Sequence, residues 1–103
     1  MTDFTDFKLP TDAERDAHKL LPHYMVQSML DYWNKRIPPG GFLRSVLAND
    51  LVGAVGHADE TNKASICNYV QWLYWNVPAR PTGWGSYKAV DKWLSQVTEH
   101  TDD

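Results

Sequence analysis

Apolar side chains recur every three or four positions along most of this chain, and no segment alternates apolar with polar residues. This period matches the 3.6 residues per turn of an α-helix, which places such side chains on one face. In the segment 22–36 the apolar positions are Tyr24, Met25, Met29, Tyr32 and Trp33. After Ser86 they are Tyr87, Val90, Trp93, Leu94 and Val97. The spacing therefore predicts an all-α protein.

Capping residues indicate where the helices begin. The stretch 11–14 has the S/T-x-x-E form of a capping box, so a short helix is expected to start there and to end before Pro22. Asp59 is the expected cap of a helix that ends at Pro78, and Ser86 is the expected cap of the last helix.

Prolines and glycines separate the central helices. The run Pro38-Pro39-Gly40-Gly41 ends the helix over 22–36, and a third helix is expected from position 41 or 42 to near His57. Gly53 and Gly56 lie within it, three positions apart, and would let another helix approach closely. We expect a compact bundle of four main helices plus a short N-terminal helix. The helical domain covers 11–98, after an N-terminal tail over 1–10 and before a frayed C-terminus over 99–103.

Tryptophan and tyrosine are unusually frequent, with five of each in 103 residues. One core of this size rarely needs all of them, so some are expected at a pocket or a subunit interface, which favours a homo-oligomer. The helix after Asp59 has apolar residues on two faces. One face holds Ile66, Tyr69, Val70, Leu73 and Val77, and the other holds Trp72, Trp75 and Asn68.

Charge and cysteine content exclude several classes of protein. A formal net charge of −3 argues against a protein that coats long DNA or RNA. No segment is long and apolar enough to span a membrane. Cys67 is the only cysteine, so no internal disulfide can form, and its place in an apolar helical pattern predicts a buried thiol in a reducing cytoplasm.

No pattern indicates an enzyme, a cofactor or a metal. The four histidines lack the spacing of a metal site, and a single cysteine cannot build a zinc cluster. His57 is expected to be an exposed cation at a helix C-terminus. A hydrolase that uses Asp50 and His57 is the least favoured hypothesis, because no nucleophile motif accompanies them.

The run Ile37-Pro38-Pro39-Gly40-Gly41-Phe42-Leu43-Arg44 is the best candidate for a site. Backbone N–H groups at the start of the following helix, at Gly40 and Gly41, could hold an anion with Arg44 as the charge partner. The alternative is a tight connection between two helices with no ligand.

Other polar residues and one aromatic residue complete this candidate ligand site. Asn49 and Asp50 could orient a ribose hydroxyl or a base N–H, although Asp50 could equally be a cap or a salt-bridge partner of Arg44, Arg36 or Lys63. Asn62 and Lys63 lie at the next helix junction. Trp84, between two glycines, could stack on a base, or it could pack over the end of the bundle.

Several short motifs resemble those of a family of small accessory proteins of tailed bacteriophages and prophages. The shared pattern is P-G-G-F-L, then A/S-V-L-x-N-D-L, then A-D-x-x-N, then W-G-S and an apolar tail with W-L. It is matched here at Pro39–Leu43, Ser45–Leu51, Ala58–Asn62, Trp84–Ser86 and Trp93–Leu94. The chain departs from it at His57, where the family often has arginine, and at Gly83, where it often has cysteine. The resemblance implies a phage protein in the cytoplasm of an infected bacterium and no particular mechanism.

Two functions follow as hypotheses. The favoured one is a non-enzymatic binding protein that counters host defence by sequestering a small phosphorylated or nucleotide signal. The other is an inhibitor or adaptor that binds a host or phage protein through the aromatic face at Trp72 and Trp75, or mimics nucleic acid through its acidic charge.

Overall fold

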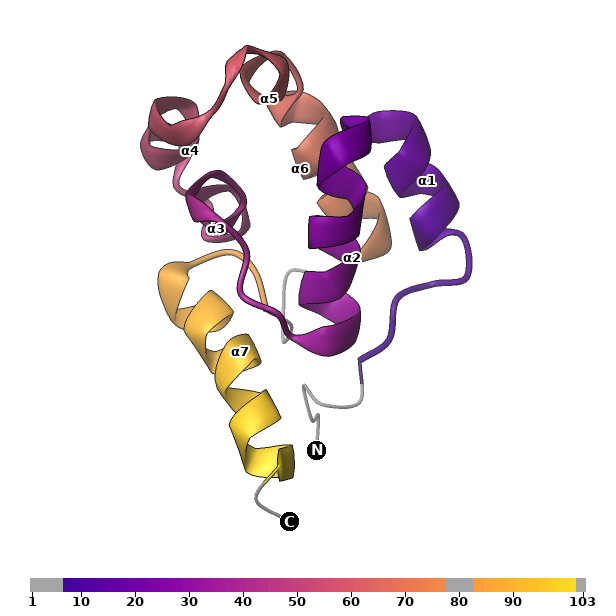
Figure 1. Cartoon of the computed structure of the whole chain (residues 1–103), viewed down its shortest axis with the longest axis vertical. Helices are drawn as coiled ribbons and strands as arrows, with labels where there is room; N and C mark the ends of the chain where they lie inside the picture. The colour runs from indigo at the N-terminus through magenta and orange to yellow at the C-terminus, as the bar shows by residue number, and fades with distance from the viewer. Residues whose placement is uncertain (1–6, 78–82, 102–103) are drawn as a thin grey trace.

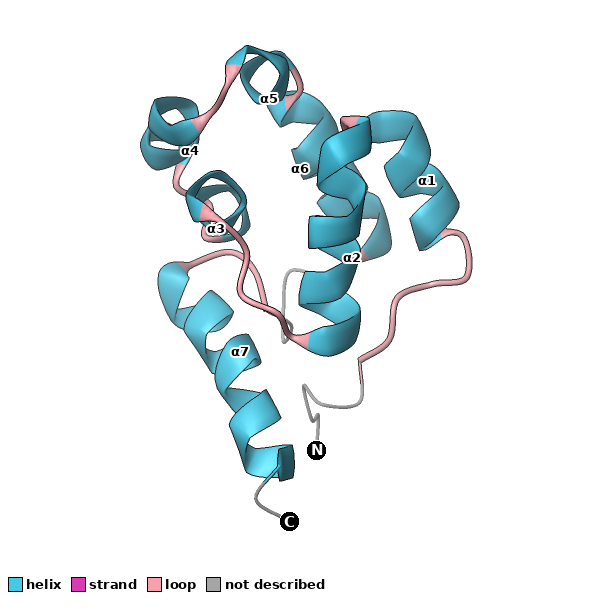
Figure 2. Ribbon diagram, viewed as in Figure 1, coloured by secondary structure: helices cyan, strands magenta, loops and turns pink. Residues whose placement is uncertain are grey.

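The computed structural model describes residues 7–77 and 83–101, and side chains as far as Ser95. Every regular element in this part of the chain is a helix, so the all-α expectation is confirmed (Figures 1 and 2). The helices are α1 (Ala13–Leu20), η2 (His23–Met25), α2 (Val26–Lys35), α3 (Gly41–Leu47), α4 (Leu51–His57), α5 (Glu60–Ala64), α6 (Ile66–Asn76) and α7 (Tyr87–Thr101). They are more numerous than the sequence predicts, because the helices expected over 22–36, from position 41 to His57 and after Asp59 are each divided into two shorter ones.

The helices pack in two groups that share one core. The first group is α1 against α2 and α6, and the second is α3 against α4 and α7. In Figure 1, α6 lies behind α2, and α7 extends below α3 toward the C-terminus. The fully buried large side chains include Tyr32, Tyr69, Trp72 and Trp93, one or more from α2, α6 and α7.

Buried aromatic side chains tie distant parts of the chain together by hydrogen bonds. Trp93 Nε1 donates to the Tyr32 carbonyl oxygen at 2.8 Å, and Trp72 Nε1 donates to the Ala13 carbonyl oxygen at 2.9 Å. The Tyr32 hydroxyl donates to the Gly83 carbonyl oxygen at 2.6 Å. These bonds satisfy the polar atoms that burial of the aromatic rings would otherwise leave unpaired. Gly83 is required there, since an added Cβ would lie 2.4 Å from the Trp93 side chain.

The single helix expected from position 41 to His57 is wrong, because the chain breaks at Asn49 and Asp50. Asn49 has a left-handed backbone with φ 62°, which ends α3. The Asp50 side chain then accepts a hydrogen bond from Gly53 N at 2.9 Å and caps α4. The spacing of apolar residues continues through Asn49 and Asp50 and predicts an unbroken helix. The local preferences of these two polar residues end one helix and begin the next instead.

The predicted caps at Asp59 and Ser86 are confirmed, whereas the capping box over 11–14 is wrong, because Asp12 is the N-cap of α1 and no side-chain hydrogen bond caps it. Asp59 Oδ1 accepts from Asn62 N at 2.7 Å, and Ser86 Oγ accepts from Ala89 N at 3.0 Å. The helix after Asp59 is interrupted at Ser65, which separates α5 from α6.

Gly53 and Gly56 differ in their surroundings. A Cβ at Gly53 would lie 2.4 Å from the Asp50 carboxylate and 2.9 Å from Ser45 Oγ of α3, so the expected close approach is found there. At Gly56 no atom from another element lies within 4 Å of an added Cβ. The close helix approach expected at this glycine is therefore wrong.

Part of the expected N-terminal tail belongs to the packed body. The Phe7 ring lies edge-on to Trp33 at 5.8 Å and to Trp93 at 6.1 Å, and Leu9 also packs against the core. Residues 1–6 lie outside the described residues. At the other end, α7 continues to Thr101, beyond the predicted domain limit of 98.

Candidate functional site

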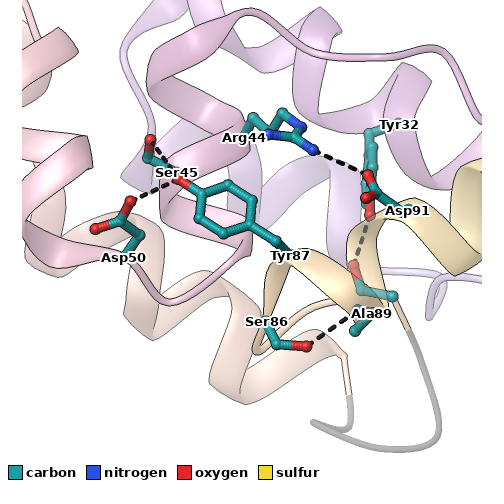
Figure 3. A network of polar contacts seen from close by, with 9 residues as sticks. Tyr32, Arg44, Ser45, Asp50, Ser86, Tyr87, Ala89 and Asp91 are labelled. Carbon is teal, nitrogen blue, oxygen red and sulfur yellow. Dashed lines mark hydrogen bonds and ion pairs between the residues drawn. The ribbon is translucent and has the colours of Figure 1, made fainter.

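The predicted ligand residues do not share one site, because the structure gives them different partners. Arg44 and Asp50 meet the first turns of α7 (Figure 3). Gly41 faces His57 of α4, and Asn62 faces Tyr69 of α6.

Tyr87 and Asp91 of α7 join Arg44 and Asp50 in one polar network. Arg44 Nη2 pairs with Asp91 Oδ1 at 2.9 Å, and the guanidinium carbon lies 4.7 Å from the centre of the Tyr87 ring. The Tyr87 hydroxyl donates to Asp50 Oδ2 at 2.5 Å and lies 3.4 Å from Ser45 Oγ (Figure 3). The network fastens the start of α7 to α3 and to the α3–α4 turn.

The Asp50 carboxylate is stabilised in its charged form by this network. The hydrogen bond from Tyr87 lowers the pKa of Asp50, and the bond from Gly53 N and the nearby His57 lower it further. Of the two structural alternatives for Asp50, the helix cap is the one found; the salt bridge with Arg44, Arg36 or Lys63 is not, since its side-chain partner is the Tyr87 hydroxyl.

The start of α3 is poorly suited to holding an anion. This helix has only seven residues. The charge of Arg44 is already balanced by Asp91. The exposed His57 ring, held by Nδ1 at 2.8 Å from the Gly53 carbonyl oxygen, lies 3.4 Å from where a Cβ of Gly41 would be. Of the two glycines in this turn, only Gly40 has open space around an added Cβ.

The remaining predicted residues have structural contacts. Asn49 is exposed and ends α3, and exposed Lys63 lies 3.5 Å from Glu60 in the same helix. Asn62 is only 5% exposed, and its Oδ1 accepts from the Tyr69 hydroxyl at 2.6 Å. Trp84 is half-buried against the core, where its Nε1 donates to the Val77 carbonyl oxygen at 3.2 Å. The packing alternative for Trp84 is thus the one found.

A second polar cluster lies around Asp59, which caps α5. The Tyr24 hydroxyl donates to Asp59 Oδ2. This bond lowers the pKa of Asp59 and raises that of Tyr24. Burial raises the pKa of the neighbouring Tyr69. Sequence reasoning missed Tyr24, Tyr87 and Asp91 as polar partners, because the first two were assigned to apolar stripes by residue type alone.

The most distinctive surface is apolar and lies on α6 and α4. We call it the α6–α4 face and define it by its exposed members, which are Leu51, Val52 and Val55 of α4 and Cys67, Val70, Tyr74 and Trp75 of α6. Val70, Tyr74 and Trp75 are 48%, 77% and 62% exposed. Leu51 and Val70 line the same cavity, so α4 and α6 lie next to each other here. Apolar side chains exposed to this degree on adjacent helices are typical of interaction surfaces.

Two sequence expectations about α6 are wrong. Trp72, expected on an outer aromatic face with Trp75, is fully buried and hydrogen-bonded to α1. Cys67, expected in the core, is exposed. Both errors come from the same cause: α6 carries apolar residues almost all round, so residue type does not show which side faces the core.

A small cavity of about 50 Å³ opens at the junction of the two helices. Its apolar walls come from α3, α4 and α6, with Asn49 and Asp50 at one side. The lining residues are Val46, Asn49, Asp50, Leu51, Ala54, Ile66 and Val70. Its size suits part of one apolar side chain and excludes a nucleotide.

Residues 7–77 and 83–101 contain neither a candidate metal cluster nor a candidate membrane span. Within these ranges, no three His, Cys, Asp or Glu side chains are grouped so as to hold a metal ion. No described helix has the length and apolar character needed to cross a membrane.

Comparison with protein families, with curated proteins and with solved structures gave no match.

Proposed function

We propose that this chain is a non-enzymatic binding protein that docks on another protein through the α6–α4 face. The observation that carries the proposal is that Val70, Tyr74 and Trp75 are all exposed on one short helix. Burying such side chains releases about 25 cal/mol per Å² of apolar surface, and aromatic residues dominate the binding energy of many interfaces.

The chemistry of the face limits what it can bind. From Ile66 to Asn76 the sequence has no Asp, Glu, Lys or Arg, and α4 has none either. The nearest charged group is Asp50 at the side of the cavity, and its carboxylate is already bonded to Tyr87 and Gly53 N. The complementary surface is therefore largely apolar. Mimicry of nucleic acid by acidic charge is not favoured at this face.

Sequestration of a phosphorylated signal remains a prediction with less support. Its proposed charge partner, Arg44, is paired with Asp91 and stacked on Tyr87. Calorimetric titration against a panel of cyclic nucleotides tests this prediction directly. Binding heats that are present in the wild type and absent in Arg44→Ala would support it. The absence of binding heat for every nucleotide would refute it. The phage origin and the location in an infected bacterial cell also remain proposals from the resemblance alone.

Site-specific photocrosslinking tests the docking proposal. A photoreactive phenylalanine analogue at position 74 is expected to trap one discrete partner in bacterial cells, identifiable by mass spectrometry. The same analogue at Ser28, an exposed position of α2, is the matched control and is expected to trap none. Adding Trp75→Glu should remove the crosslink. Absence of a specific product from positions 70, 74 and 75 would refute the proposal.

A further inference from the structure

We propose that the partner of the α6–α4 face is a second copy of the same chain, with the two α6 helices packed antiparallel about a two-fold axis near Val70. The inference rests on the proposed function, because it assigns an occupant to the same surface. It follows from the charge, the spacing and the shape of that surface.

The absence of charge favours self-association. A two-fold interface brings each patch against itself, so any charged residue near the axis would face its own kind. Charged residues make up 22% of the chain, which would place two or three among the 11 residues of α6, yet α6 has none. The contrast with α1, whose exposed positions hold Glu14, Arg15 and Lys19, shows that exposed helices of this protein are not generally uncharged.

The spacing of exposed residues on α6 fits a helix–helix contact. Cys67, Val70 and Tyr74 occupy positions i, i+3 and i+7, the spacing of a seam between two packed helices. The buried residues Tyr69, Trp72 and Leu73 lie on the opposite side and hold α6 to the core. The outer seam is thus available without any rearrangement of the fold.

The cavity beside α6 is consistent with the register of the antiparallel α6 pair. With an antiparallel axis near Val70, Tyr74 of one copy lies opposite Ile66 of the other. Ile66 and Val70 form one wall of the 50 Å³ cavity, and Leu51 of α4 is on another. Tyr74 can therefore lie over the cavity mouth, in reach of the exposed α4 side chains.

The area that a stable dimer needs is larger than α6 alone can supply. A stable interface needs about 800 Å² from each partner, which is roughly an eighth of the 6295 Å² surface of this chain. Because α6 is only about 16 Å long, exposed α4 residues must contribute to reach this area.

Sedimentation of the full chain tests the inference. The mass is expected to rise from 11.8 kDa toward twice that value as the concentration increases from about 1 to 500 µM. Tyr74→Glu should keep the protein monomeric, because in this register it would bury a carboxylate against the partner's Ile66 and the apolar wall of the cavity. Ser28→Glu adds the same charge on α2 and should leave the dimer intact. Circular dichroism melts establish that both variants are folded.

Cys67 gives a geometric test without any added cysteine. In the proposed register the two Cys67 Cα atoms lie about 9 Å apart along the helix axes and about 9 Å apart across the helix pair. The distance between them is therefore roughly 13 Å, so a bismaleimide with a spacer of about 10 Å should produce a covalent dimer. Cys67→Ser should abolish the product, and Tyr74→Glu should reduce it at least tenfold.

The outcomes separate this inference from the proposed function. A chain that stays at 11.8 kDa at all concentrations, or a dimer indifferent to Tyr74→Glu, overturns the inference. If position 74 then still traps a different protein in cells, the docking proposal stands. If it traps nothing, both fail.

Discussion

At the scale of single residues, most of the predicted ligand contacts are replaced by contacts within the protein. Asn62 shows this most clearly: its side chain is buried and accepts the Tyr69 hydroxyl, with no room for a ligand. Arg44 shows it too, with Asp91 in the place of an anion. A polar residue at a helix junction satisfies a neighbour's hydrogen bond more often than it binds a ligand.

Tyr69→Phe tests the role of Asn62. Without the hydroxyl, Asn62 Oδ1 loses its donor while buried, so the free energy of unfolding should fall by about 1–3 kcal/mol. Tyr74→Phe makes the same chemical change at an exposed position and should stay within about 0.5 kcal/mol of the wild type. Urea unfolding measures both. Equal effects of the two substitutions would contradict the assignment.

Asn49 offers a second test at this scale. Its left-handed backbone suits asparagine and glycine, whereas alanine in that conformation costs about 1–2 kcal/mol. Asn49→Ala should therefore lower the free energy of unfolding by about that amount, and Asn49→Gly should be close to neutral. A ligand-binding role with no structural role would leave the thermal stability of both variants unchanged.

At the scale of elements, short helices are stabilised by side-chain caps and by the tyrosines that hold those caps. Asp50 caps α4 and is held by Tyr87 of α7, and Asp59 caps α5 and is held by Tyr24 of η2. Helices of seven and five residues are not stable alone, so these contacts and packing must hold them.

The caps predict how stability depends on pH. The pKa values of Asp50 and Asp59 are both lowered in the folded protein by hydrogen bonds from Tyr87 and Tyr24. The unfolded chain then takes up protons first as the pH falls below about 4. The stability that these carboxylates contribute is present above that pH and is lost as the pH falls through the lower, folded pKa values.

Thermal melts between pH 6 and pH 3 measure this effect. The double variant Asp50→Asn/Asp59→Asn should show a smaller loss of melting temperature over this range, because asparagine caps without titrating. A variant as sensitive to acid as the wild type would count against the two carboxylates.

At the scale of the whole molecule, aromatic packing joins the chain's two ends to its middle. Phe7, Trp33 of α2 and Trp93 of α7 meet in one cluster, and the Arg36 guanidinium lies 3.8 Å from the Trp93 ring centre. Many of the surplus aromatic residues are used here. Tyr74 and Trp75, the two most exposed of the tyrosines and tryptophans, are on the α6–α4 face.

Phe7→Ala tests whether the segment before α1 is part of the fold. Because Phe7 is half-buried against two tryptophans, its removal should lower the free energy of unfolding by about 1–3 kcal/mol. Lys8→Ala, at the exposed neighbour, is the control and should change it by less than about 0.5 kcal/mol. If this segment were a loose tail, Phe7→Ala and Lys8→Ala would give the same free energy of unfolding in urea.

Helical class and several boundaries could be predicted from the sequence because they depend on local chemistry. The apolar period, the caps at Asp59 and Ser86 and the proline–glycine turn act within a few residues of chain. The break at Asn49 and Asp50 was also signalled locally, by a residue that tolerates left-handed backbone followed by a capping residue. It was missed because the apolar period runs on through it.

The side of α6 that faces the core, and the partners of Arg44 and Asp50, were decided only by the tertiary structure. Trp72 and Trp75 are chemically alike and three positions apart, yet one donates a hydrogen bond to α1 and the other faces outward. Tyr87 and Asp91 are about forty residues away from the groups that they bind. Local pattern carries no information about such pairings, because they depend on how whole helices pack against one another.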